Sequence, residues 1–151
     1  MKSLIKFVSS FFYLGYLPWI PGTIASIAAL ILYFLFKKDI LSYAILFIVV
    51  CGLGFLVAGR AEKSFKEKDS GKIVIDEVAG LLLAFFGLNL EPVLIIVGFL
   101  IFRALDAIKV YPADKIEKRG GSLGIMGDDL VAGFYTNVIL QIVTRVFLQW
   151  R

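Results

Sequence analysis

The stretch ILSYAILFIVVCGLGFLVAG occupies residues 40–59 and contains no charged side chain. Its length matches the roughly 20 apolar residues that a helix needs to cross the hydrocarbon core of a bilayer. A second uncharged run, residues 7–36, precedes it. The whole chain of 151 residues is 60% hydrophobic, whereas apolar residues make up about 45–50% of an ordinary globular domain. The sequence therefore predicts one membrane-embedded domain over residues 1–151.

Further apolar segments lie on both sides of this stretch, and polar or charged residues separate them. The charged segment 60–72 must face water, and the polar stretch 111–127 forms a long connection. We expect an all-α, polytopic membrane bundle with an N-terminal interfacial helix over residues 2–14. The bundle would contain about five membrane or re-entrant helices, over residues 23–36, 40–59, 73–86, 92–109 and 128–148.

The distribution of basic residues predicts how this bundle is oriented. With a cytoplasmic N-terminus, five spans would put residues 60–72 and 110–127 on the cytoplasmic side, together with most of the sixteen Lys and Arg residues. This distribution follows the positive-inside rule and predicts a multi-pass protein whose polar loops face the cytoplasm. The net charge of +4 suits the anionic head groups of lipids. No nucleic-acid-binding signature is visible, so no nucleic-acid partner is expected.

Five carboxylates lie in or beside apolar segments, namely Asp76, Glu77, Asp106, Asp128 and Asp129. Burying charge there is costly, so such residues pair with one another, with a cation or with a substrate, and they mark functional sites. Four of the five form adjacent pairs. Neighbouring carboxylates repel unless they share a proton or bind a hard cation such as Mg²⁺. In the five-span topology, all five would gather at the cytoplasmic interface.

Simpler structural roles are open to the same acids. Asp76 and Glu77 could favour the positive end of a helix dipole while facing head-group water. Asp128 could be the N-cap of the last helix, with Asp129 in its first turn. Gly80, one turn beyond Asp76, would permit another helix to approach closely.

The segment FRALDAIKVYP, residues 102–112, places three charges at a spacing of three. Arg103, Asp106 and Lys109 therefore share one helical stripe. They could form ion pairs that steady the helix end, each worth about 0.2–0.5 kcal/mol. At the end of a membrane helix they better fit a site in which Arg103 and Lys109 bind a phosphate and Asp106 binds a metal ion.

Two short segments could bind an anion through backbone amides. The glycines of GGSLGIMG, residues 120–127, allow amides to turn toward an anion just before the Asp128 pair. The PGT of residues 21–23 is followed by Ser26. This segment could be a turn in which Thr23 caps a helix, or an anion site at a helix start.

The chain contains no histidine, which excludes imidazole acid–base catalysis and His-ligated zinc. Its one cysteine, Cys51, lies in the middle of the predicted 40–59 helix and is expected to be a packed apolar residue. The carboxylates are therefore the candidate catalytic groups.

Four short motifs occur in order along the chain: PGTIAS (21–26), IDEVAG (75–80), FRALDAIKVYP (102–112) and GIMGDDLVAG (124–133). Together they resemble the phosphatidylglycerophosphatase A family, over nearly the whole chain. The resemblance implies a Mg²⁺-dependent phosphatase of the inner (cytoplasmic) membrane that converts phosphatidylglycerophosphate to phosphatidylglycerol. The family usually has glycine at the position of Ala25 and proline at that of Val110, and these departures concern backbone shape rather than reactive groups.

The resemblance also implies roles for individual residues. The signature acids, which would bind Mg²⁺ and carry the catalysis, fall on Asp76, Glu77, Asp106, Asp128 and Asp129. The other polar positions of the family, which would bind the anionic phospholipid substrate, fall on Thr23, Ser26, Arg103 and Lys109. We expect attack by water rather than an aspartyl-phosphate intermediate, although both need an acid beside a metal ion.

The residues alone leave two other functions open. A transferase that joins head groups to CDP-activated lipids would also use clustered aspartates and Mg²⁺, but its DG…AR…G…D…D spacing is absent. A non-enzymatic ion-translocating protein could also carry buried acids. Its acids would reach through the bilayer midplane, whereas acids gathered at one interface beside basic residues favour head-group chemistry.

Overall fold

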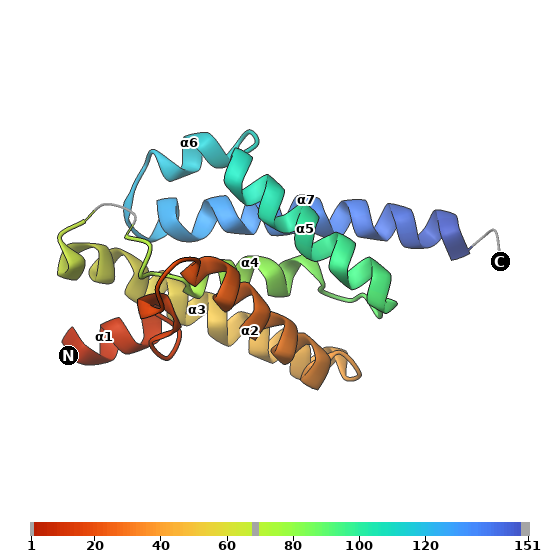
Figure 1. Ribbon diagram of the computed structural model, residues 1–151, viewed down its shortest axis with the longest axis horizontal. Coiled ribbons are helices and arrows are strands. Elements are labelled where there is room, and N and C mark those ends of the chain that lie inside the picture. The colour runs from red at the N-terminus through yellow and green to blue at the C-terminus, as the bar shows by residue number, and fades with distance from the viewer. Residues whose placement is uncertain (1, 68–69, 149–151) are drawn as a thin grey trace.

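The computed structural model describes residues 2–67 and 70–148, and within these ranges the chain folds entirely into helices and connections (Figure 1). The elements are α1 (Lys2–Ser9), the 3₁₀ helix η1 (Leu14–Tyr16), α2 (Pro21–Phe36), α3 (Ile40–Phe65), α4 (Ile75–Ala84), α5 (Pro92–Ile108), α6 (Ala113–Glu117) and α7 (Gly121–Leu148). The expected all-α fold is confirmed for the described residues. Residues 68 and 69 of the charged segment lie outside them.

Two of these helices, α3 and α7, are long and apolar enough to cross a bilayer. α3 has 26 residues and exposes large apolar side chains that include Leu41, Ile48 and Leu56. An apolar surface of this extent indicates contact with lipid or with another protein. α2 and α5 have 16 and 17 residues and α4 has only 10, which is short of the roughly 20 needed for a full span. Five complete spans are therefore not confirmed.

α4 lies at the centre of the bundle, between α7 on one side and α2 and α3 on the other (Figure 1). Nearly all of its side chains are buried. A helix that is apolar on all sides is buried, either in a protein core or in a membrane. Here protein surrounds it, so the segment 73–86, expected as a membrane or re-entrant helix, contains a short core helix of 10 residues.

Buried polar side chains satisfy the carbonyl groups at the C-terminal end of α4. The Tyr43 hydroxyl donates to the Leu82 carbonyl at 2.8 Å. The Asn137 amide donates to the carbonyls of Ala84 at 3.1 Å and Phe86 at 3.0 Å. The last carbonyls of a helix have no partner within the helix, so these side chains let α4 end inside the protein.

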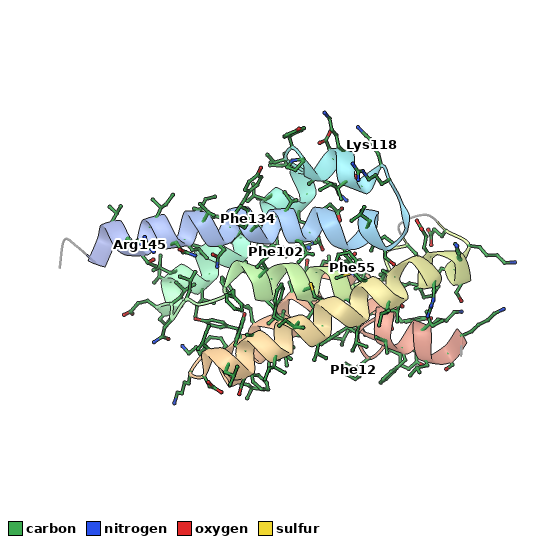
Figure 2. All side chains as sticks on the ribbon, turned by 180° about the vertical axis from the view of Figure 1, so that it is seen from behind. Phe12, Phe55, Phe102, Lys118, Phe134 and Arg145 are labelled. Atoms are coloured by element: carbon green, nitrogen blue, oxygen red, sulfur yellow. The ribbon has the colours of Figure 1, made fainter. Side chains whose placement is uncertain are left out.

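Gly80 allows α7 to pack directly on α4, as the sequence predicted. A Cβ atom on Gly80 would lie 2.7 Å from the carbonyl oxygen of Asp129 and 2.8 Å from the Phe102 ring, and one on Gly133 would collide with the Gly80 carbonyl. Figure 2 shows Phe102 inside the bundle and Phe134 on the outer side of α7. The contact brings the acid-bearing turns of α4 and α7 together.

α7 begins at Gly121, earlier than the expected start at residue 128. The Gly121 amide donates to Glu62 Oε2 at 3.1 Å, and Ser122 Oγ accepts the Gly59 amide at 2.9 Å. These contacts with α3 hold a glycine-rich segment in a helix that its own propensity disfavours. The simpler role considered for Asp128, capping this helix, does not fit, because Asp128 lies about two turns inside it.

The N-terminal elements also differ from the sequence prediction. α2 begins at Pro21 and its N-cap is Ile20, so Thr23 lies inside the first turn and does not cap the helix. α1 ends at Ser9, whereas the interfacial helix was expected to reach residue 14. The chain reverses at Phe11, Phe12 and Tyr13, all of which have positive φ angles, so the helix cannot continue.

Candidate active site

The first turn of α4 carries Asp76 and Glu77 into the interior of the bundle. The Val74 amide donates to the Ser9 carbonyl at 3.0 Å and so fixes the start of α4 against the end of α1. Asp76 is only 7% exposed. Burial raises the pKa of both carboxyl groups, and the charge of Glu77 raises the pKa of Asp76 further. Facing head-group water, the simpler role considered for this pair, does not fit an Asp76 so deeply buried.

Asp129 approaches these two acids from α7. Asp76, Glu77 and Asp129 each offer one carboxylate oxygen, and the three oxygens lie within 4.8 Å of one another. Asp129 is 3% exposed. The Gly80 contact described above places the Asp129 backbone against α4, which explains how a residue far away in sequence reaches the pair. We call Asp76, Glu77 and Asp129 the carboxylate cluster.

The carboxylate cluster has the composition of a hard-cation site. Glu77 Oε2 is buried and has no hydrogen-bond partner among the described residues. Buried polar atoms are normally bonded, and a buried charge without a partner is costly. Carboxylate oxygens are the ligands that Mg²⁺ prefers in proteins, and a cation between these three would offset their mutual repulsion. The donors present therefore fit Mg²⁺.

Asp106 and Asp128 border the carboxylate cluster and are ion-paired. Arg103 Nη1 lies 2.7 Å from Asp106 Oδ2, within α5. Lys109 Nζ lies 2.6 Å from Asp128 Oδ2 and 3.1 Å from Glu117 Oε1. The expected helical stripe thus divides into one pair within α5 and one network that joins α5, α6 and α7. The positively charged side chains of Arg103 and Lys109 therefore lie beside the acids.

The charges of the five acids act on one another across the site. Asp106 and Glu77 lie close enough to Asp129 for their charges to act on it, and Asp128 and Asp129 are likewise close enough to act on Asp76. The structure therefore brings together all five acids that the sequence singled out.

The first turn of α2 lies against the same site. A Cβ on Gly22 would collide with the Glu77 carboxylate and would lie 3.5 Å from Arg103 Nη1. Ser26 is buried and its hydroxyl donates to the Gly22 carbonyl at 2.9 Å, while Thr23 is partly exposed. The PGTIAS motif is thus next to the acids, with Gly22 as the residue in closest contact. The glycine of this motif is the sequence signal for that contact, whereas only the hydroxyl residues Thr23 and Ser26 were predicted to belong to the site.

The glycine-rich segment 120–127 does not form the expected anion loop. The Gly121 amide is bonded to Glu62, as described above, and Gly124 and Gly127 lie inside α7. A Cβ on Gly124 would lie 2.8 Å from the Glu117 carbonyl oxygen, and one on Gly127 would lie 2.5 Å from the Ile116 side chain. These glycines allow α6 to pack on α7, which positions Glu117 beside Lys109.

Comparisons with known proteins agree with this arrangement of motifs. Residues 7–144 match the model of a family described as phosphatidylglycerophosphatase A. The chain is 32% identical to phosphatidylglycerophosphatase A of Escherichia coli over 133 residues, which cover 85% of this chain and 77% of that protein. It is 31% identical over 141 residues to a Bacteroides thetaiotaomicron protein provisionally named phosphatidylinositol-3-phosphatase, covering 87% of this chain and 88% of that protein. No solved structure matches the chain.

Proposed function

The chain belongs to the phosphatidylglycerophosphatase A family, and from that membership we propose that it hydrolyses phosphatidylglycerophosphate to phosphatidylglycerol and inorganic phosphate. Water would attack the terminal phosphorus, the bond to the glycerol oxygen would break, and that oxygen would leave with a proton. The observation that carries the proposal is the carboxylate cluster with Arg103 and Lys109 beside it. The carboxylates can hold a cation and the two basic side chains can bind an anionic phosphate, so the site suits hydrolysis of a phosphate monoester.

Asp76, Glu77 and Asp129 are the residues that we expect to hold Mg²⁺, with Asp106 and Asp128 next to them. When bound, Mg²⁺ supplies positive charge that offsets the charge of the phosphate and makes water more acidic. The carboxylates come from two helices whose contact at Gly80 leaves little freedom, so the ligand atoms are held in place before the substrate arrives.

Arg103 and Lys109 would bind the phosphate monoester. Each is about one quarter exposed and now bonds to a carboxylate. A phosphate could replace that carboxylate as acceptor, so substrate binding would release Asp106 and Asp128 from their ion pairs. The planar Arg103 guanidinium can bond two phosphate oxygens at once, whereas Lys109 acts as a single charge.

We also infer that the site faces the cytoplasmic side of the inner membrane in a multi-pass protein. Two helices that could cross a bilayer support membrane association. Lys109 and Arg103 lie at the end of α5 that meets α6, beside the polar connection expected to be cytoplasmic. Acids gathered at one end of helices beside basic side chains favour head-group chemistry over ion translocation.

The test is phosphate release by the purified full-length protein from three lipids: phosphatidylglycerophosphate, phosphatidic acid and phosphatidylinositol-3-phosphate. The last is included because of the name of the Bacteroides relative. We expect phosphatidylglycerophosphate to have the highest kcat/KM, chelation to abolish release, and Mg²⁺ to restore it. Preference for the inositol lipid would replace the proposed substrate, and full activity in excess chelator would overturn the metal requirement.

A further inference from the structure

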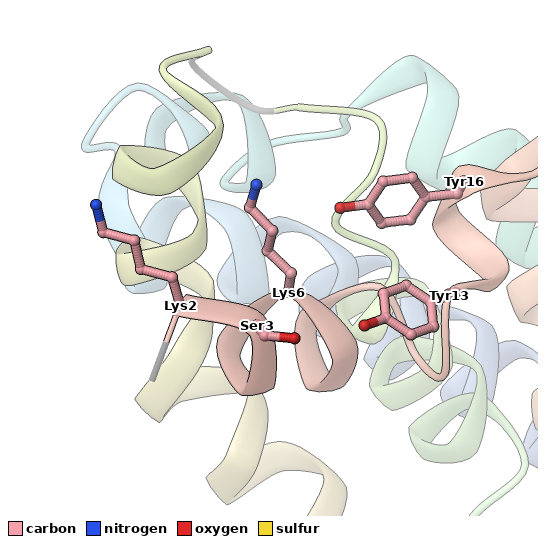
Figure 3. Close-up of a pocket in the computed structure, with 5 residues that line it drawn as sticks. All are labelled: Lys2, Ser3, Lys6, Tyr13 and Tyr16. Atoms are coloured by element: carbon pink, nitrogen blue, oxygen red, sulfur yellow. The ribbon is translucent and has the colours of Figure 1, made fainter.

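An open cavity of about 590 Å³ lies at the N-terminal end of the bundle, formed by residues outside the candidate active site. Its lining residues are Lys2, Ser3, Lys6, Tyr13 and Tyr16 (Figure 3). The first three belong to α1, and the tyrosines come from the turn and η1 that follow it. Pockets of about 300–1,000 Å³ are usual for small ligands, so a head group is of suitable size.

The two charged side chains that line the cavity, Lys2 and Lys6, are both positive, and a third lysine, Lys72, lies over the ring of the lining residue Tyr16. Lys6 Nζ lies 5.2 Å from the centre of the Phe65 ring, and Lys72 Nζ lies 5.7 Å from the centres of both the Tyr16 and Phe65 rings. Within residues 2–67 and 70–148, no carboxylate lies within 4.0 Å of the ammonium groups of Lys2, Lys6 or Lys72. Ammonium groups held together on aromatic rings can still donate hydrogen bonds, and an anion would offset their repulsion.

The N-terminal segment that forms the cavity also exposes large apolar side chains. Leu4 on α1 is 65% exposed, Phe12 in the turn is 63% exposed, and Trp19 just after η1 is 94% exposed. Trp and Tyr are enriched where a protein meets the head groups of a bilayer, with Lys reaching into the same layer.

We propose that this cavity binds the phosphate head group of an anionic phospholipid, at a site separate from the carboxylate cluster. Lys2, Lys6 and Lys72 supply the positive charge, the hydroxyls of Ser3, Tyr13 and Tyr16 supply further donors, and the exposed apolar residues meet the acyl region. The site holds α1 and η1 at the membrane surface.

The segments that form the cavity pack against the residues that lead into α4. Gly15 packs so closely on the Lys72 carbonyl that a Cβ atom there would collide with it, and the Val74 amide bonds to the Ser9 carbonyl. A lipid bound at the cavity therefore stabilises the backbone that leads into Asp76 without contacting the acids.

The test measures lipid binding by native mass spectrometry of the full-length protein in neutral detergent, with short-chain phosphatidylglycerol, phosphatidylcholine or inorganic phosphate added. We expect phosphatidylglycerol to bind more tightly than phosphatidylcholine. The double variant Lys2→Gln/Lys6→Gln should bind phosphatidylglycerol about tenfold more weakly, because each lysine near a membrane surface contributes to attraction of anionic lipid. Lys2→Arg/Lys6→Arg should restore the binding.

Lys63→Gln is the control, because Lys63 is an exposed lysine in the last turn of α3 that does not line the cavity. It removes one positive charge, whereas the double variant removes two. It should leave the preference for phosphatidylglycerol intact. Equal weakening in Lys63→Gln, or unchanged binding in the double glutamine variant, would overturn the proposal. Inorganic phosphate that binds as tightly as phosphatidylglycerol would show a free-phosphate site instead. Phosphate release is not the readout, so failure of the phosphatase proposal leaves this result interpretable.

Discussion

Asp76 on α4 and Asp129 on α7 present carboxylate oxygens within 4.8 Å of each other, and both side chains are buried. Repulsion between two such groups in a protein interior is strong, so the arrangement costs stability unless a proton or a cation intervenes. The close contact between Gly80 and Gly133 fixes the two helices at this separation. The fold therefore holds the acids together by backbone packing.

Asp129→Asn and Asp76→Asn should each reduce phosphate release by orders of magnitude while the protein stays folded, because asparagine keeps the size but loses the charge that attracts Mg²⁺. The wild-type melting temperature should rise on adding Mg²⁺, and both variants should lose that rise. Asp39→Asn is the control. Asp39 caps α3 by accepting the Leu41 and Ser42 amides, a role that asparagine fills about as well. Near-normal turnover in both cluster variants would make these acids structural.

Gly133→Ala should lower both the melting temperature and the activity. The added Cβ would collide with the Gly80 carbonyl, and overpacking of this kind costs about 1–3 kcal/mol. The separation of α4 and α7 sets the spacing of the carboxylates, so kcat should fall even at temperatures where the variant is folded. Gly52→Ala in α3 is the matched control, since nothing lies within 4 Å of its added Cβ, and it should be neutral or stabilising. A stable, fully active Gly133→Ala protein would contradict the packing account.

Lys109→Met should destabilise the protein, because it leaves Asp128, whose side chain is 7% exposed, without the ammonium at 2.6 Å. A hydrogen bond to a charged group contributes about 1.5–3 kcal/mol to stability, and the substitution removes this one. Adding Asp128→Asn should recover part of the loss, and a double-mutant cycle on the free energy of unfolding measures the coupling. Additive effects would show that this pair contributes nothing specific. Glu117→Gln, which removes only the negative charge of the more exposed acceptor at 3.1 Å, should cost less.

Asn137→Leu should unfold at a lower temperature than the wild type, because its amide satisfies the Ala84 and Phe86 carbonyls at the end of α4. Leaving those buried acceptors unbonded costs about 1–3 kcal/mol. Asn89→Leu, at an exposed residue in the neighbouring connection, is the comparison and should change stability little. Thermal melts in one detergent give both values, and equal melting temperatures would show that the carbonyls find other donors.

Reporters inserted at residues 67 and 117 should both be found in the cytoplasm, as the distribution of basic residues predicts. Residue 67 follows α3 and residue 117 ends α6, and Glu62 near the end of α3 bonds to the start of α7, so the two positions lie at the same end of the bundle. Labelling from opposite faces of the membrane would conflict with that proximity. Accessibility of single cysteines to a membrane-impermeant reagent checks the result independently.

The sequence predicted the helical class, the two longest helices and the acids that meet in the structure, because apolar run length and misplaced charge are local signals. It could not show that α4 is buried by protein, since an apolar helix looks alike in lipid and in a protein core. The start of α7 was misplaced because its glycines disfavour a helix, and contacts with other elements, including those with Gly59 and Glu62, hold it. Gly22 went unnamed because its closeness to Glu77 depends on how α2 packs on α4.

The enclosure of α4 has a consequence for how the protein meets different membranes. Its acids lie on a helix of ten residues wrapped by α2, α3 and α7, so their surroundings are amino acids and not hydrocarbon chains. A thicker or thinner bilayer would change the tilt of long helices such as α3. α4 has no span length to match, so the residues packed around Asp76 would remain protein side chains in either bilayer.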